Sequence, residues 1–374
     1  MAKGIYLGID SLSRKVKKMY LGIEGVARKV KKGYVGVNGL ARLFFSGTAG
    51  LNKSSHVITN LTVEMWSHKS AHTGNYALVG GGSPIINRIV NAYDVDFVQQ
   101  IPTEMGYPSY GSPSNYESAS ASSSLYAWLT TKGGTNNTPK YSVYDSSLTR
   151  TKNSEFYNGS GAGCDFTAGA MFAGGQDGGT ASSLVTWYNN DLTEEKVRTL
   201  QPRSDLAGAR AGDYAVFTGG DTGSNTKGTV EAYTEELVKT VLPDLPFHVW
   251  DHVGVRLGTT AVFAGGYDGK ETLDTVFAYD EDLSEISCPS LPYKARYHAG
   301  DGSEELAIFA GGGDEHTLGE SASAHVSFLD TDFTMHTAAE MDTERAAPNI
   351  AKCGNGFLIS GGDNLQTVEL YEIA

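Results

Sequence analysis

A short apolar run that ends in two glycines recurs along most of the chain. One copy is VFAGG at residues 262–266. The copies end at Gly81, Gly175, Gly220, Gly266, Gly312 and Gly362. The intervals after Gly175 are 45, 46, 46 and 50 residues, and the interval before it holds two such periods. Residues 126–131 stand where the missing copy belongs, without its glycines, so the pattern predicts seven copies of one unit.

A second strand pattern, usually carrying a tyrosine, follows each copy, as in VFAY at 276–279. In most copies a turn and a further strand follow, for example at 196–200. Four strands in about 46 residues form one blade of a β-propeller. The glycine-pair strand with its later aromatic resembles the kelch repeat, whose family fold is a β-propeller. The resemblance implies an all-β, seven-bladed kelch-like β-propeller over residues 46–374, although Leu329 replaces the aromatic in the sixth copy.

The ends of the propeller sequence predict how the ring closes. The last copy stops after its third strand, at Ala374, whereas a strand-like segment, VITNLTV at 57–63, precedes the first glycine pair. We expect residues 57–63 to complete the seventh blade, because such a clasp removes an exposed sheet edge.

Residues 1–45 contain a different repeat, with a period of 14 residues. Tyr6, Tyr20 and Tyr34 occupy the same place in its three copies. Each copy predicts two short strands around a tight turn, for example 19–23 and 26–30, and the third copy has Asn-Gly in the turn. So small a β-meander buries little surface alone, so we expect it to dock or oligomerise. The basic residues between and on its strands, which fit either an acidic partner or a solvated face, include Arg14, Lys17, Arg28, Lys31 and Arg42.

Composition and charge narrow the function classes. The chain has 374 residues, with 46 glycines and 20 tyrosines, which excludes a helical bundle. Its net charge of −14 is uneven, because residues 1–45 hold ten basic and two acidic residues. We find no long apolar run or secretory signal and therefore expect a protein that neither enters a membrane nor leaves by the general secretory route. The three cysteines share no close spacing and are expected to be reduced.

Candidate ligand-binding residues gather in the segments that join predicted blades, which share one face with the loops between the second and third strands. Aromatic rings beside arginine and histidine suit sugars, which pack on rings and take directed hydrogen bonds. The alternative is that several of these side chains only fill gaps between blades. The candidates are Trp66, His72, Tyr107, Tyr110, Tyr116, Arg210, Trp250, His252, Arg296, Tyr297 and His298.

Two further features have competing interpretations. The segment 105–124 mixes Tyr, Ser, Gly and Pro, which is typical of either a recognition loop or a spacer. Aspartates such as Asp221 and Asp268 follow most glycine pairs and suit either calcium or, more simply, tight turns. We therefore predict no metal and no cofactor, and no catalytic motif predicts an enzyme.

The 14-residue units of residues 4–45 resemble short repeats of bacteriophage tail and appendage proteins. That resemblance implies a virion protein assembled in the bacterial cytoplasm, with residues 1–45 anchoring it to other virion proteins, as a homo-oligomer. The propeller would then bind a host-surface glycan or protein; nucleic acid is not an expected partner. A purely structural or decoration role, and a glycan-active enzyme, remain as alternatives.

Overall fold

The computed structural model describes most of the chain. Residues outside the description are 1–5, 10–11, 16–18, 24–25, 31, 38–39, 47–49, 66–67, 82–87, 107–118, 132–139, 156–158, 178–179, 223–227 and 314–321. For residues 6–46 the description covers the backbone strands alone. No helix in the described part of the chain is long and apolar enough to cross a membrane.

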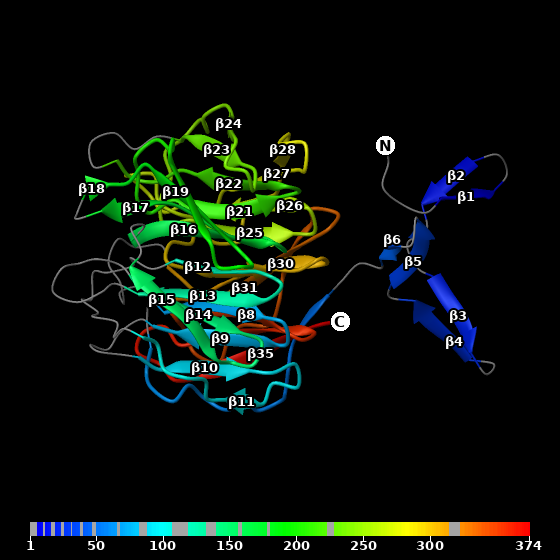
Figure 1. Ribbon diagram of the computed structural model, residues 1–374. Coiled ribbons are helices and arrows are strands. Elements are labelled where there is room, and N and C mark those ends of the chain that lie inside the picture. Colours follow the sequence, from blue (N-terminus) through cyan, green and yellow to red (C-terminus); the bar gives the residue numbers. More distant parts are fainter. Residues whose placement is uncertain are drawn as a thin grey trace.

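Residues 50–374 form seven antiparallel sheets, each with four strands in a path from the centre outward (Figure 1). The inner strands are β8 (Lys69–Thr73), β12 (Ser120–Ser122), β16 (Gly159–Asp165), β21 (Ala207–Ala211), β25 (Val253–Leu257), β29 (Ala299–Gly302) and β33 (Asn349–Cys353). Each inner strand contacts the inner strands of the next and the previous sheet, and β33 contacts β8. The seven sheets therefore form a closed ring, a seven-bladed β-propeller.

The remaining strands of the blades follow the predicted order. The second strands are β9 (Tyr76–Gly80), β13 (Tyr126–Thr131), β17 (Gly169–Asp177), β22 (Tyr214–Thr218), β26 (Thr260–Ala264), β30 (Leu306–Ala310) and β34 (Gly356–Ser360). The third strands are β10 (Val90–Tyr93), β14 (Lys140–Asp145), β19 (Leu184–Asn189), β23 (Val230–Tyr233), β27 (Val276–Tyr279), β31 (Val326–Asp330) and β35 (Val368–Ile373). The fourth strands are β11 (Gln99–Gln100), β15 (Arg150–Glu155), β20 (Glu194–Arg198), β24 (Lys239–Val241), β28 (Glu285–Ser287), β32 (Met335–Thr337) and β7 (Leu51–Lys53), and a short β18 (Thr180–Ala181) extends β17.

The hydrophobic core lies between neighbouring blades rather than inside any one of them. In one cluster, Met171 and Val185 of the third blade pack with Phe217 and Tyr233 of the fourth. The repeated tyrosine of the third strand is buried in this way, and Leu329 is buried at the same position of the sixth blade. An apolar side chain of either shape therefore serves there, which explains why the loss of the aromatic does not disrupt that blade.

The ring is closed by β7 and not by residues 57–63, which corrects the sequence prediction. Leu51–Lys53 pairs with β35, with Lys53 opposite Tyr371. The segment 57–63 forms no strand: Ile58 and Leu61 are buried between the seventh and first blades, and Val57 is 91% exposed. The apolar residues of 57–63 are therefore spaced for packing between blades and not for pairing in a β-ladder.

The closing strand takes part in a cluster of arginine, glutamate and lysine, here called the polar lock, that also occurs in the fourth blade. There the buried pair Arg203 and Glu231, with Nη1 and Oε2 3.0 Å apart, is joined by Lys239 of β24. In the seventh blade Arg345 pairs with Glu369 at 2.7 Å, and Lys53 of β7 lies 2.7 Å from the same carboxylate. Lys53 and Lys239 have the same register, each opposite the tyrosine of the third strand. The N-terminal strand is therefore a full member of its blade.

The N-terminal repeats form three two-stranded hairpins: β1 (Tyr6–Ile9) with β2 (Leu12–Lys15), β3 (Met19–Ile23) with β4 (Val26–Val30), and β5 (Lys32–Val37) with β6 (Leu40–Ser46). The strands of the second copy match the prediction. The continuous meander is wrong, because the described ladders pair strands only within a hairpin. Each 14-residue copy contains both of its own strands and so completes its pairing locally.

Candidate functional site

The inner strands enclose a channel of about 810 Å³ that residues from all seven blades line. Its two ends differ. At the interblade end lie the segments that join the blades; at the opposite end, here called the turn end, lie the turns between inner and second strands. Along the channel the inner strands approach one another closely through their backbones. A Cβ on Gly254 would lie 2.6 Å from the Gly208 carbonyl oxygen, and one on Gly208 would lie 2.9 Å from that of Gly163. Glycine there permits the close approach of neighbouring blades.

One position of the inner strand, near the turn end, carries polar side chains in six of the seven blades. The strand registers identify it, because its partner in the second strand is alanine in every blade except the last. The residues at this ring position are His72, Ser122, Asp165, Arg210, Arg256, Gly302 and Lys352. All of them line the channel.

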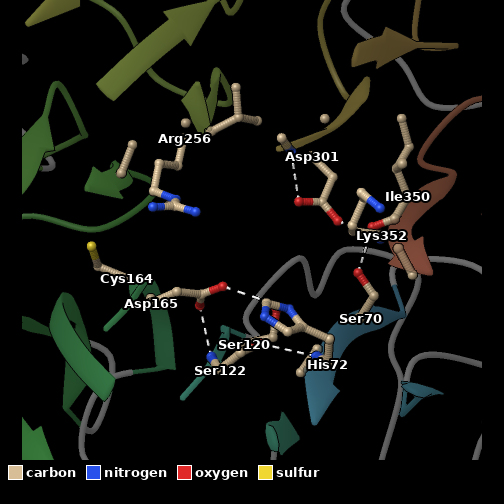
Figure 2. Close-up of a pocket in the computed structure, with 18 of the residues that line it drawn as sticks. Ser70, His72, Ser120, Ser122, Cys164, Asp165, Arg256, Asp301, Ile350 and Lys352 are labelled. Carbon is tan, nitrogen blue, oxygen red and sulfur yellow. Dashed lines mark hydrogen bonds and ion pairs between the residues drawn. The ribbon is translucent and has the colours of Figure 1, made fainter. Parts of the chain in front are cut away.

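The carboxylates of the ring are tied to the backbone of neighbouring blades. The His72 amide donates to the Ser122 hydroxyl at 2.9 Å, and the Ser122 amide donates to Asp165 at 2.7 Å. The other Asp165 oxygen lies 3.8 Å from Nδ1 of His72. Figure 2 shows these three side chains along one side of the opening, with Arg256 and Asp301 across from them. The first three blades are thus linked at this position by hydrogen bonds.

Asp301 precedes the ring glycine of the sixth blade and accepts two backbone hydrogen bonds. The amides of Gly302 and Lys352 each donate to one of its oxygens at 2.6 Å. Desolvation inside the channel raises the pKa of Asp301 to about 6, although His72 and these hydrogen bonds act in the opposite direction.

His72 and Arg210 do not lie in the segments that join blades, which corrects the sequence prediction. His72 belongs to β8 and Arg210 to β21, both at the turn end. The two residues flank the tight turns at Gly74 and Gly212, whose polar, glycine-containing sequences resemble loops. They are therefore separated, by the length of the inner strands, from the other candidates that the structure describes.

Three of those other candidates do come together, at the interblade end between the fifth and sixth blades. The Arg296 guanidinium donates to one Asp251 oxygen through Nε at 2.9 Å and through Nη2 at 2.6 Å. It lies 4.4 Å from the ring centre of Tyr267 and 4.5 Å from that of Tyr297. Trp250 meets Tyr267 edge to face, 5.0 Å between centres. Burial raises the pKa of Asp251, and Arg296 opposes the shift.

This arrangement, here called the aromatic cluster (Trp250, Tyr267, Arg296 and Tyr297), combines fixed and accessible parts. Arg296 is only 9% exposed, whereas the three rings are partly exposed. Because Asp251 holds the guanidinium, the rings stacked on it have little freedom to move. Preorganised aromatic faces of this kind can pack against a sugar or another apolar surface.

His252 and His298 lie below that surface, buried between blades together with His68. Each packs against the first glycine of the preceding blade's pair: a Cβ on Gly219 would lie 2.8 Å from His252, and one on Gly265 would lie 2.6 Å from His298. Desolvation lowers the pKa of His252 to about 3 and that of His298 to about 4. This packing gives both rings a structural role, and ligand binding by them stays a prediction.

The other predicted positions lie beyond what the structure describes. Trp66, Tyr107, Tyr110, Tyr116, Lys17 and Lys31 fall outside the described residues. Arg14, Arg28 and Arg42 lie in β2, β4 and β6, whose backbones alone are described.

Asp268, which follows the glycine pair of the fifth copy, behaves as a turn residue. Asp268 accepts the amides of Lys270 and Glu271, at 2.7 and 2.8 Å. Among the described residues, no group of three or more His, Cys, Asp or Glu side chains is placed to hold a metal ion.

Sequence reasoning missed Asp165, Arg256, Asp301 and Lys352. A signal was present, because Asp165, Arg256 and Lys352 each lie ten residues before the second glycine of a pair, next to a short turn, and Asp301 lies eleven before it. Reading the repeat backward from each glycine pair to the equivalent inner-strand position would have aligned the first three as one ring, with Asp301 beside it.

Comparison with known proteins gives the fold. No protein-family model matches the chain, and no curated protein matches it significantly. Among solved structures, the one described as "Structure of YjhT" is similar, with a TM-score of 0.52 and 13% sequence identity, over 85% of this chain and 96% of that one. At that identity the likeness concerns the architecture alone: this chain is a seven-bladed β-propeller of the kelch-like kind.

Proposed function

We propose that this chain is a bacteriophage virion protein, in a tail, baseplate or fibre appendage, whose propeller binds a host-surface glycan or protein. The 14-residue repeats support the phage assignment through their resemblance to appendage proteins. In this proposal residues 1–45 attach the propeller to other virion proteins, and the protein acts by binding and not by catalysis.

The aromatic cluster is the observation that carries the binding proposal. Its rings are partly exposed and are fixed by a buried arginine and aspartate pair, so little entropy is lost when a ligand packs on them. Weak contacts at such a surface suffice, since many copies on one particle raise the effective concentration of the second and later contacts. A deep pocket is therefore not required on this face.

The test is adhesion of the full-length chain to wall polysaccharides and intact cells of Gram-positive gut bacteria. Trp250→Ala removes the outer ring of the cluster, and we expect binding to weaken about thirtyfold, as for an aromatic hot spot. Val238→Ala, a change at a side chain that is 59% exposed on the fourth blade, is the matched control and should leave binding unchanged. If the wild-type chain binds only virion components, the propeller has a purely structural or decoration role. If it converts a polysaccharide instead of retaining it, the protein is an enzyme.

A further inference from the structure

The turn end of the channel brings three cationic side chains together beside acidic ones, in an otherwise acidic propeller. Residues 46–374 contain 19 basic and 41 acidic residues. Three of those basic residues, Arg210, Arg256 and Lys352, nevertheless share the ring position, and all three line the channel. A local excess of hydrogen-bond donors inside a cavity attracts an anion even when the whole surface is negative.

Four acidic side chains line the same end, Asp165, Asp301, Glu304 and Glu305, and the two aspartates among them are held by the protein. Both Asp301 oxygens accept backbone amides, and one Asp165 oxygen accepts the Ser122 amide while the other faces His72. A carboxylate whose oxygens accept hydrogen bonds from the protein has less capacity to bind hydroxyls of a ligand or to repel an anion. Asp165 and Asp301 therefore have a structural role at the turn end of the channel, and the cationic side chains are the groups available to bind a ligand.

Arg256 is the donor best placed for a ligand. Its Nη2 lies 2.6 Å from Glu304, whose side chain is 57% exposed, so this pair lies in solvent and contributes little. In Figure 2 the guanidinium points into the opening enclosed by Asp165, His72 and Asp301. A guanidinium has five donors in a planar fork that matches an oxyanion, and the exposed pair uses one of its nitrogens.

Gly302 leaves space between Arg256 and Lys352. It occupies the ring position of the sixth blade, where a Cβ would collide with the Arg256 carbonyl oxygen. The close approach of the two backbones thus excludes a side chain from the one blade that separates the two cations. An anion of a few atoms over this glycine would lie between Arg256 and Lys352, whose ammonium donates to the Gly354 carbonyl in the ligand-free chain.

We propose that the turn end of the channel binds a small oxyanion, the phosphate or carboxylate group of a polyol or sugar, with Arg256 as its principal partner and Lys352 and Arg210 as supporting cations. This site lies at the opposite end of the propeller from the aromatic cluster. It goes beyond the proposed function and does not depend on it.

Isothermal titration of the full-length chain tests the site. The ligands are glycerol 1-phosphate, glucuronate and, as neutral controls, glycerol and glucose. We expect at least one anionic ligand to bind with a millimolar or lower Kd and the neutral ligands to bind at least about tenfold more weakly, because charge-assisted hydrogen bonds are the stronger ones. Comparing the Kd of glycerol 1-phosphate with that of glucuronate shows whether the site prefers a phosphate or a carboxylate.

Two variants and a control locate the binding. Arg256→Gln and, separately, Lys352→Gln should each weaken the anionic ligand about tenfold or more. Arg198→Gln, the same substitution at an exposed arginine of the outer strand β20, should have no effect. Equal affinity for neutral and anionic ligands, no binding of either anion, or unchanged affinity in both ring variants would overturn the proposal. None of these outcomes affects the adhesion test, because Trp250 lies at the other end.

Discussion

The two ends of the propeller use the same kinds of polar side chain for different purposes. At the interblade end Arg203, Arg345, His252 and His298 are buried and packed between or beneath blades. At the turn end His72 is 46% exposed and Arg256 39% exposed, and both line the channel. Exposure separates the two groups, whereas residue type does not, and His252 and His298 also line the channel. An arginine or histidine between propeller blades is therefore the stronger candidate for binding when the fold leaves its side chain exposed.

Breaking the polar lock of the seventh blade should cause the largest loss of stability. Arg345→Met leaves the largely buried Glu369 with Lys53 and the Asp342 amide as its partners, and we expect the free energy of unfolding to fall by about 3–5 kcal/mol. Urea unfolding of the full-length chain measures the change. The double variant Arg345→Met with Glu369→Met should recover part of the loss, and a double variant no more stable than the single one would contradict the role of the carboxylate that has lost Arg345.

A smaller loss is expected where the inner strands touch. Gly254→Ala places a methyl group 2.6 Å from the Gly208 carbonyl oxygen, so neighbouring blades must move apart at a cost of about 1–3 kcal/mol. Gly50→Ala is the control, because its Cβ would lie 3.7 Å from Ala374, an ordinary contact. Equal unfolding midpoints for the two variants would show that the channel is wider than described.

The buried histidines should make stability depend on pH. Burial holds the pKa of His252 near 3, below the ordinary 6.5, so the folded chain keeps the ring neutral while the unfolded chain takes up a proton. Stability from this residue is present above pH 6.5 and falls by about 1.4 kcal/mol per pH unit as the pH drops from 6.5 toward 3. His252→Gln should reduce the pH slope of the unfolding free energy by about this amount. An unchanged slope would mean that the ring is protonated in the folded protein.

The sequence was sufficient to predict the closed, seven-bladed propeller but not the geometry of its channel. Glycine pairs near 46-residue intervals predicted the blades because Gly265, with φ of 66°, adopts a conformation that other residues avoid. The closing strand was misplaced because Leu51–Lys53 is three residues long and has no apolar alternation, whereas 57–63 has apolar residues that pack elsewhere.

The candidate site was harder to predict because it is formed by residues from separate blades. Whether Arg210, Arg256 and Lys352 share a cavity depends on the register of three inner strands in three blades. Trp250 was predicted in one blade junction and Arg296 and Tyr297 in the next, and the structure brings the three near each other because these junctions are neighbours. Their partner Tyr267 follows the glycine pair of the fifth copy and reaches the same junction through an isolated bridge to Trp250, which strand periodicity does not reveal.

The most direct test of the contrast between the two ends is to measure unfolding free energy and glycerol 1-phosphate affinity for both Arg256→Gln and Arg345→Met. We predict that Arg256→Gln changes stability by no more than about 0.5 kcal/mol and weakens the ligand about tenfold, since its pair with Glu304 is exposed. Arg345→Met should do the reverse, with lower stability and unchanged affinity at temperatures where it remains folded. An Arg256→Gln protein that loses several kcal/mol yet binds the ligand as well as the wild type would contradict the account.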